Sequence, residues 1–115
     1  MIRYAKDMQI IDKVQMCGGK GTTKMSPLFA SNEFKGRARL ICTITLAPGC
    51  SVGEHKHEDE EEIIYIVNGK ATYYDNREVY ELHPGDVALT LGGMSHGIAN
   101  NTDEMLVYTA TILTY

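Results

Sequence analysis

The chain has 115 residues, of which 15 are acidic and 11 are basic, and its formal net charge is −4 at pH 7. This length is typical of one folded unit, so a single domain over residues 1–115 is expected. An acidic chain without a basic stripe binds phosphates poorly, and no apolar run is long enough to cross a bilayer. Nucleic acids and membranes are therefore not expected as partners.

The cysteines and the first residues predict the compartment. Cys17, Cys42 and Cys50 are odd in number and have no Cys-x-x-Cys spacing, which argues against a disulfide framework and against a structural zinc site. The opening stretch MIRYAKDMQIIDK lacks the continuous apolar core of a signal peptide. A cytoplasmic protein with free thiols is expected.

In chain order, helices are predicted only near the N-terminus, and strands are predicted in the rest of the chain. Residues 1–15 and residues 23–34 are the only segments in which helices are predicted. The rest of the chain alternates turn residues with short runs rich in Ile, Val, Thr, Tyr and Leu, such as residues 39–46, 86–91 and 104–115. This pattern predicts an all-β sandwich or barrel.

Two turn motifs mark the ends of predicted strands. Asn68 and Gly69 lie between two β-rich runs, and both residue types tolerate positive φ, so a hairpin is predicted there. The segment HPGD, residues 83–86, predicts a turn that enters the strand VALTL, because Pro84 sets the bend. His83 is interpreted as a residue of this turn.

The segment GEHKHEDEEEIIYIVNG, residues 53–69, carries the first candidate site. His55 and His57 are two positions apart, so on a strand both imidazoles point to the same face and could hold a metal ion. Five acids follow the second histidine. Because buried carboxylates without partners are costly, at most one or two of these acids can face inward.

Glu62 is the acid that we place inside the fold. It begins the apolar run IIYIV, whereas residues 58–61 are interpreted as a solvated bend. A further ligand would be His96, which follows a Gly-Gly turn, although a histidine in that position is more often a surface residue. These side chains can meet only if the sheet curls until the strands face one another.

Both regions resemble the two sequence motifs of the cupin family. The first motif lies within residues 49–69 and consists of Gly49, His55, His57, Glu62 and Gly69, separated by five, one, four and six residues. The second motif lies within residues 85–100 and contains Gly85, Gly93, His96 and Asn100. Only Leu91 departs from the family pattern, which usually has proline there.

The resemblance implies a fold and a metal site. The implied fold is the double-stranded β-helix, the jelly-roll form of β-barrel. The implied ligands of one divalent metal ion are His55, His57, Glu62 and His96. An open site of nitrogen and oxygen ligands suits manganese, iron, nickel or cobalt, whereas zinc more often takes four ligands. Manganese is favoured among them because the chain resembles oxalate-decarboxylase-like proteins.

The resemblance also implies a range of functions. Short chains with these motifs resemble oxalate-decarboxylase-like proteins, so the leading hypothesis is a metal-dependent enzyme that acts on a small carboxylate or carbonyl compound. The alternatives are a dioxygenase, an isomerase or a lyase acting on a chelating small molecule, and a binding module for a metal or small molecule without turnover. Glu33 and Tyr108 are the only candidates offered for a proton donor.

Strand parity predicts the wall of the site. Ile64 and Ile66 share the face of the glutamate ligand, and Ser51 and Gly53 share the parity of the first two histidines, so all four should face inward. Arg39 is the best candidate for an inward cation, although an arginine on such a strand more often lies at the surface. A pocket that is mostly apolar, with the predicted metal site as its one polar region, favours a small anion or a diketone over a sugar as its ligand.

The expected assembly is a homodimer. A small open sandwich exposes strand edges, and pairing of two chains covers them. The resemblance to cupins implies that the N-terminal segment crosses to the partner.

Overall fold

The computed structural model describes all residues from Met1 to Tyr115. Its strands are β1 (Ile11–Val14), β2 (Thr22–Pro27), β3 (Ala38–Leu46), β4 (Ser51–Lys56), β5 (Glu60–Asn68), β6 (Ala71–Asp75), β7 (Glu78–Leu82), β8 (Val87–Thr90), β9 (Ser95–Ala99) and β10 (Leu106–Thr114). Two 3-10 helices, η1 (Ala5–Asp7) and η2 (Met16–Gly18), complete the elements. Neither has the length or the apolar character that spanning a bilayer requires.

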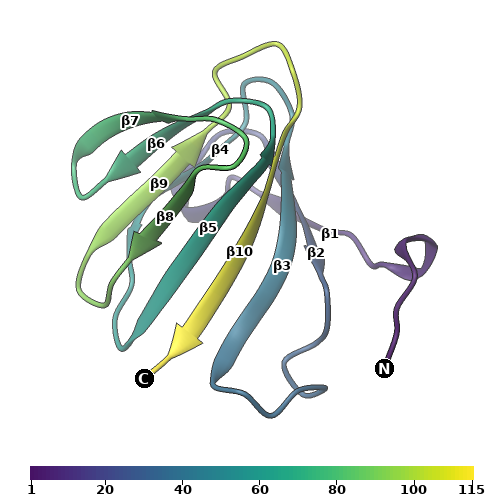
Figure 1. Cartoon of the computed structure of the whole chain (residues 1–115). Coiled ribbons are helices and arrows are strands. Elements are labelled where there is room, and N and C mark those ends of the chain that lie inside the picture. The colour runs from purple at the N-terminus through teal and green to yellow at the C-terminus, as the bar shows by residue number, and fades with distance from the viewer.

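The strands form two antiparallel sheets that face each other (Figure 1). One sheet has six strands in the order β1-β2-β3-β10-β5-β8, and the other has four in the order β4-β9-β6-β7. The predicted all-β architecture is confirmed. All three cysteines are free, as expected.

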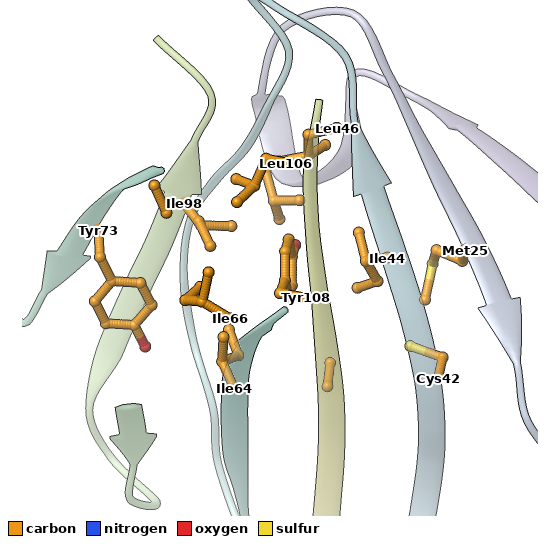
Figure 2. Close-up of a cluster of buried hydrophobic side chains, with 13 residues drawn as sticks. Met25, Cys42, Ile44, Leu46, Ile64, Ile66, Tyr73, Ile98, Leu106 and Tyr108 are labelled. Carbon is orange, nitrogen blue, oxygen red and sulfur yellow. The ribbon is translucent and has the colours of Figure 1, made fainter. Parts of the chain in front are cut away.

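The core lies between the two sheets, where period-two burial brings apolar side chains from both together (Figure 2). On β10, Leu106, Tyr108, Ala110 and Ile112 are buried, and the residues between them are partly exposed. β5 follows the same rule, since Ile64 and Ile66 are buried, as predicted. The outward residues of β5 include exposed apolar side chains, Tyr65 and Val67.

The helices predicted near the N-terminus are wrong. Residues 1–15 contain only the single turn η1 and the strand β1, and residues 23–34 contain most of β2. β2 pairs with β1 on one side and with β3 on the other. These ladders satisfy the backbone polar groups of β2, and this tertiary pairing overrides a weak local helix propensity.

The hairpin predicted at Asn68 and Gly69 is also wrong, although the turn exists. Gly69 has φ +84°, and a Cβ there would collide with the carbonyl oxygen of Met105. However, β5 pairs with β8 and β10, whereas β6 pairs with β7 and β9 in the other sheet. The turn is therefore a corner between the sheets. The turn at residues 83–86 leads into β8 as predicted.

Candidate metal centre

The four sequence-predicted ligands lie together between the sheets. His55 is on β4, His57 directly follows that strand, Glu62 is on β5 and His96 is on β9. One potential ligand atom from each residue lies within 4.8 Å of those from the other three. His55 is half-buried and the other three are buried. We call these four residues the ligand cluster.

The imidazoles converge through their Nε2 atoms. The Nε2 atom of His57 lies 3.1 Å from that of His55 and 3.0 Å from that of His96, and the remaining Nε2 pair is 3.2 Å apart. One Glu62 oxygen lies 3.2 Å from Nε2 of His57, and the other lies 3.6 Å from Nε2 of His96. Four potential donor atoms thus surround one point.

The opposite ring nitrogens all have partners outside the ligand cluster. His55 Nδ1 donates to the carbonyl oxygen of Gly53 at 2.7 Å. His57 Nδ1 donates to the Glu60 carboxylate at 2.6 Å. Because a carbonyl and a carboxylate only accept, Nδ1 carries the proton in both rings and Nε2 presents a lone pair to the centre.

His96 is held by hydroxyl groups. Its Nδ1 lies 2.7 Å from the Tyr73 hydroxyl and 2.9 Å from Oγ1 of Thr90, and these two hydroxyls lie 3.0 Å from each other. Metal-binding histidines are normally fixed in this way through the ring nitrogen that faces away from the ion. Nitrogen lone pairs that point toward one position repel one another, and a cation bound at that position would remove this repulsion.

The nitrogen separations distinguish two coordination geometries. Ligand atoms about 2.1 Å from an ion lie about 3.0 Å apart at right angles and about 3.4 Å apart at tetrahedral angles. The observed range of 3.0–3.2 Å is therefore closer to right-angled coordination, which leaves further positions open. The residues present fit a divalent metal ion.

Burial disfavours charge within the ligand cluster itself. It lowers the pKa of His96 to about 3, with His55 and His57 contributing in the same direction. Burial also lowers the pKa of His55. It raises the pKa of Glu62 to about 7. His55 and His96 are therefore available as neutral ligands at neutral pH.

Glu60 is a site residue that the sequence interpretation missed. Its carboxylate is mostly buried and joins His57 to Arg39, whose Nε and Nη2 donate to it at 2.7 and 2.8 Å. The Arg39 guanidinium lowers the pKa of Glu60 to about 2. The prediction of a solvated bend over residues 58–61 is thus wrong for Glu60. The available signal was parity, because Glu60 and Glu62 share a face of β5.

A β-bulge in β4 changes which of its side chains face inward, relative to the prediction from alternation along the strand. The register with β9 shifts between Val52 and His55, so Val52 faces the core and lines the cavity beside the ligand cluster. The prediction that Ser51 and Gly53 face inward is wrong for this reason. Ser51 instead accepts a hydrogen bond from the backbone N–H of Lys20 at 2.9 Å.

A cavity of about 330 Å³ opens beside the ligand cluster. Arg39 lines the cavity but is exposed, so it lies at the solvent side, or mouth, of the cavity, where it is bonded to Glu60. Tyr108 lines the inner wall. Glu33 lies elsewhere, in an ion pair with Arg3 at 2.9 Å, and is therefore not a proton donor to this cavity.

Comparisons with known proteins find related sequences and structures. The Cupin domain family model matches residues 42–112. A Thermotoga maritima protein named "Oxalate-binding protein" is 41% identical over 98 residues, which cover 85% of this chain and 81% of the relative. The crystal structure of a predicted oxalate decarboxylase from Thermotoga maritima has a TM-score of 0.95 and 36% identity, with 100% of both chains covered. The polyketide cyclase RemF from Streptomyces resistomycificus, at TM-score 0.81 and 20% identity over 99% of this chain and 79% of its own, shares the fold.

Proposed function

The chain belongs to the cupin family and has the double-stranded β-helix fold, and from this premise we propose that the ligand cluster binds one divalent transition-metal ion. The observation that carries the proposal is the convergence of three Nε2 atoms at 3.0–3.2 Å. The opposite nitrogen of each ring is already held by another group. Manganese is the favoured ion, because right-angled nitrogen and oxygen ligands suit it better than they suit zinc.

The proposed ligand is a small carboxylate or carbonyl compound that chelates the ion through two oxygens. The names of the two Thermotoga maritima relatives, which refer to oxalate, support this class. When bound, the metal supplies Lewis acidity and, for manganese or iron, a redox centre. The protein's own contribution is to orient the imidazoles through their Nδ1 partners and to line the cavity with apolar side chains.

A second candidate function is binding without turnover. Glu62 is the only carboxylic acid on the cavity wall, so no second acid is placed to donate a proton. Tyr108 is the only phenol there, and burial raises its pKa well above the ordinary value, which makes it a weak acid. A protein that captures an oxygenated anion on its metal is consistent with this wall.

The experiment is to load the protein with Mn²⁺ and to measure bound metal by elemental analysis. One ion per chain is expected in the native protein, and its loss is expected in the double variant His55→Ala and His57→Ala. The control is His83→Ala, which removes an exposed histidine. Equal metal content in the double variant and the native protein would overturn the proposal.

Assays on the Mn²⁺-loaded protein distinguish the candidate reactions. Release of carbon dioxide from oxalate would indicate a decarboxylase, and oxygen uptake with a catechol or a diketone would indicate a dioxygenase. Binding of oxalate without either product would indicate the second candidate.

We also propose that the protein is a homodimer. The N-terminal segment extends away from the two sheets (Figure 1). It exposes apolar side chains, including Ile2, Tyr4 and Ile10 at 80%, 65% and 67%. A partner chain would cover them, and sedimentation analysis with and without residues 1–10 tests this. The cytoplasmic location stays a prediction.

A further inference from the structure

The cavity beside the ligand cluster is larger than a two-carbon dicarboxylate requires. Its volume of about 330 Å³ equals about eleven water molecules at ~30 Å³ each. Its inner wall is formed by buried side chains: Met25, Ile44, Val52, Ile64, Ile98, Tyr108, Ala110 and Ile112. Most of these side chains are drawn in Figure 2, where they extend from both sheets into the space between them. We call this part of the cavity the apolar chamber.

The sequence of β10 helps to open the apolar chamber. Ala110 lies between the larger residues Tyr108 and Ile112 on the inward face of that strand. It is paired with Cys42 on β3 and with Ile64 on β5, both of which are short or branched rather than long. A methyl group at this central position leaves volume that a leucine would fill.

The Tyr108 hydroxyl is an unpaired polar group on this wall. The residue is only 1% exposed, but its hydroxyl is not among the fully buried side-chain atoms without a partner, and the residue lines the cavity. Burial raises its pKa well above the ordinary value, so the group is a protonated donor at neutral pH. There it can donate a hydrogen bond to an oxygen of a ligand or of water.

Positive charge is confined to the mouth of the cavity. Lys13 and Arg39, both exposed, are the only cationic side chains on the wall, and Arg39 is bonded to Glu60. No cation lies among the residues of the apolar chamber. A second carboxylate at its inner end would therefore be buried without a counterion, which is unfavourable. The charged group of a bound small molecule is therefore expected to lie near the ligand cluster and the mouth of the cavity.

We propose that the site takes a chelating monocarboxylate, of the 2-oxo acid class, whose apolar chain is longer than that of pyruvate and packs in the apolar chamber. The inference rests on the proposed metal centre, which would hold the carboxylate and the adjacent oxo group. The chain packs against isoleucine and methionine side chains. The Tyr108 hydroxyl donates a hydrogen bond to an oxygen of the ligand or of a bound water.

The experiment measures the affinity of the Mn²⁺-loaded protein for one series of ligands by calorimetry. The series is pyruvate, 2-oxobutanoate, 2-oxopentanoate and 2-oxohexanoate, and oxalate is measured beside it. Each added methylene is expected to tighten binding about three- to fourfold, as for burial of a CH₂ group. The longest member is expected to bind more tightly than oxalate.

Two variants locate the effect in the apolar chamber. Ala110→Leu is expected to abolish the gain with chain length, and Ala110→Val is the milder alternative if folding suffers, which the circular dichroism spectrum of each variant checks. The matched control is Thr111→Leu, which adds a leucine on the opposite face of β10 and should keep the gain.

The possible failures are distinguishable. A series without gain, or oxalate binding more tightly than every member, would overturn the inference and leave the metal centre intact. Retention of the gain in Ala110→Leu would overturn it as well. Failure of the native protein to bind Mn²⁺ would overturn the proposed function together with the inference.

Discussion

Oε2 of Glu60 lies 2.6 Å from Nδ1 of His57, and the same carboxylate is held from the other side by Arg39 at 2.7 and 2.8 Å. This contact places the imidazole proton on Nδ1 and turns the Nε2 lone pair toward the other ligands. Arg39 stands at the mouth of the cavity, so the three residues connect the mouth to the proposed metal centre.

Glu60→Ala is expected to weaken Mn²⁺ binding about 10- to 100-fold, because the ring of His57 loses the group that orients it. Glu60→Gln keeps an acceptor for Nδ1–H and should lose less. Affinity is measured by competition with a chelator, and Glu61→Ala, which removes the acid on the opposite face of β5, is the control. Equal affinity in Glu60→Ala and Glu61→Ala would show that Glu60 does not position His57.

Tyr73→Phe and Tyr108→Phe form a matched pair for stability. Tyr73 bonds Thr90 and His96 at 3.0 and 2.7 Å, so its variant should lower the free energy of unfolding by about 1–3 kcal/mol. Tyr108→Phe removes a hydroxyl that faces the cavity and bonds no other residue, so it should change stability by less than about 0.5 kcal/mol. Urea denaturation in the presence of a chelator measures both. An equal loss in the two variants would contradict the contacts described.

The pH dependence of the metal-free protein tests the environment of Glu62. Burial raises its pKa to about 7 in the folded state, above the ordinary value of 4.5. Between those values the folded state holds the extra proton, so this residue contributes more stability at pH 5 than at pH 7.5. Glu62→Gln lacks this contribution.

The measurement for Glu62 is the free energy of unfolding at pH 5 and at pH 7.5, with a chelator present. The free energy of unfolding of Glu62→Gln, taken relative to that of the native protein, should decrease as the pH falls. Groups that are distant from Glu62 titrate equally in both proteins and cancel in the difference. A difference that does not change with pH would mean that Glu62 is not desolvated.

Gly53→Ala tests the contact between β4 and the loop that precedes β2. A Cβ at Gly53 would collide with the carbonyl oxygen of Cys17, and one at Gly19 would collide with that of Ser51. The expected cost is about 1–3 kcal/mol of unfolding free energy, as for overpacking. Gly36→Ala is the control because a Cβ there meets nothing within 4 Å. Equal stability of the two variants in urea would refute the close approach.

The all-β fold and the proximity of His55, His57, Glu62 and His96 could be predicted because each depends on local or motif information. Short β-rich runs between turns indicate strands without knowledge of their partners. The spacing of both motifs identified the histidines and Glu62 before any geometry was known, and the structure brings them together. The inward positions of Ile64 and Ile66 followed from parity along the unbroken strand β5.

The predictions are wrong where contacts between residues distant in the sequence determine the local structure. The bulge after Val52 shifts the register with β9, and nothing in the local pattern marks it. β2 is a strand because β1 and β3 pair with it. Glu60 was assigned to a charge run, yet its position depends on Arg39, which is 21 residues away in the sequence.

Diffraction from crystals grown with Mn²⁺, recorded with anomalous signal from manganese, tests the metal centre most directly. The expected result is one strong peak between Nε2 of His55, His57 and His96 and the carboxylate of Glu62. A map without a peak at that point, or with its only peak bound to other residues, would contradict the proposed function.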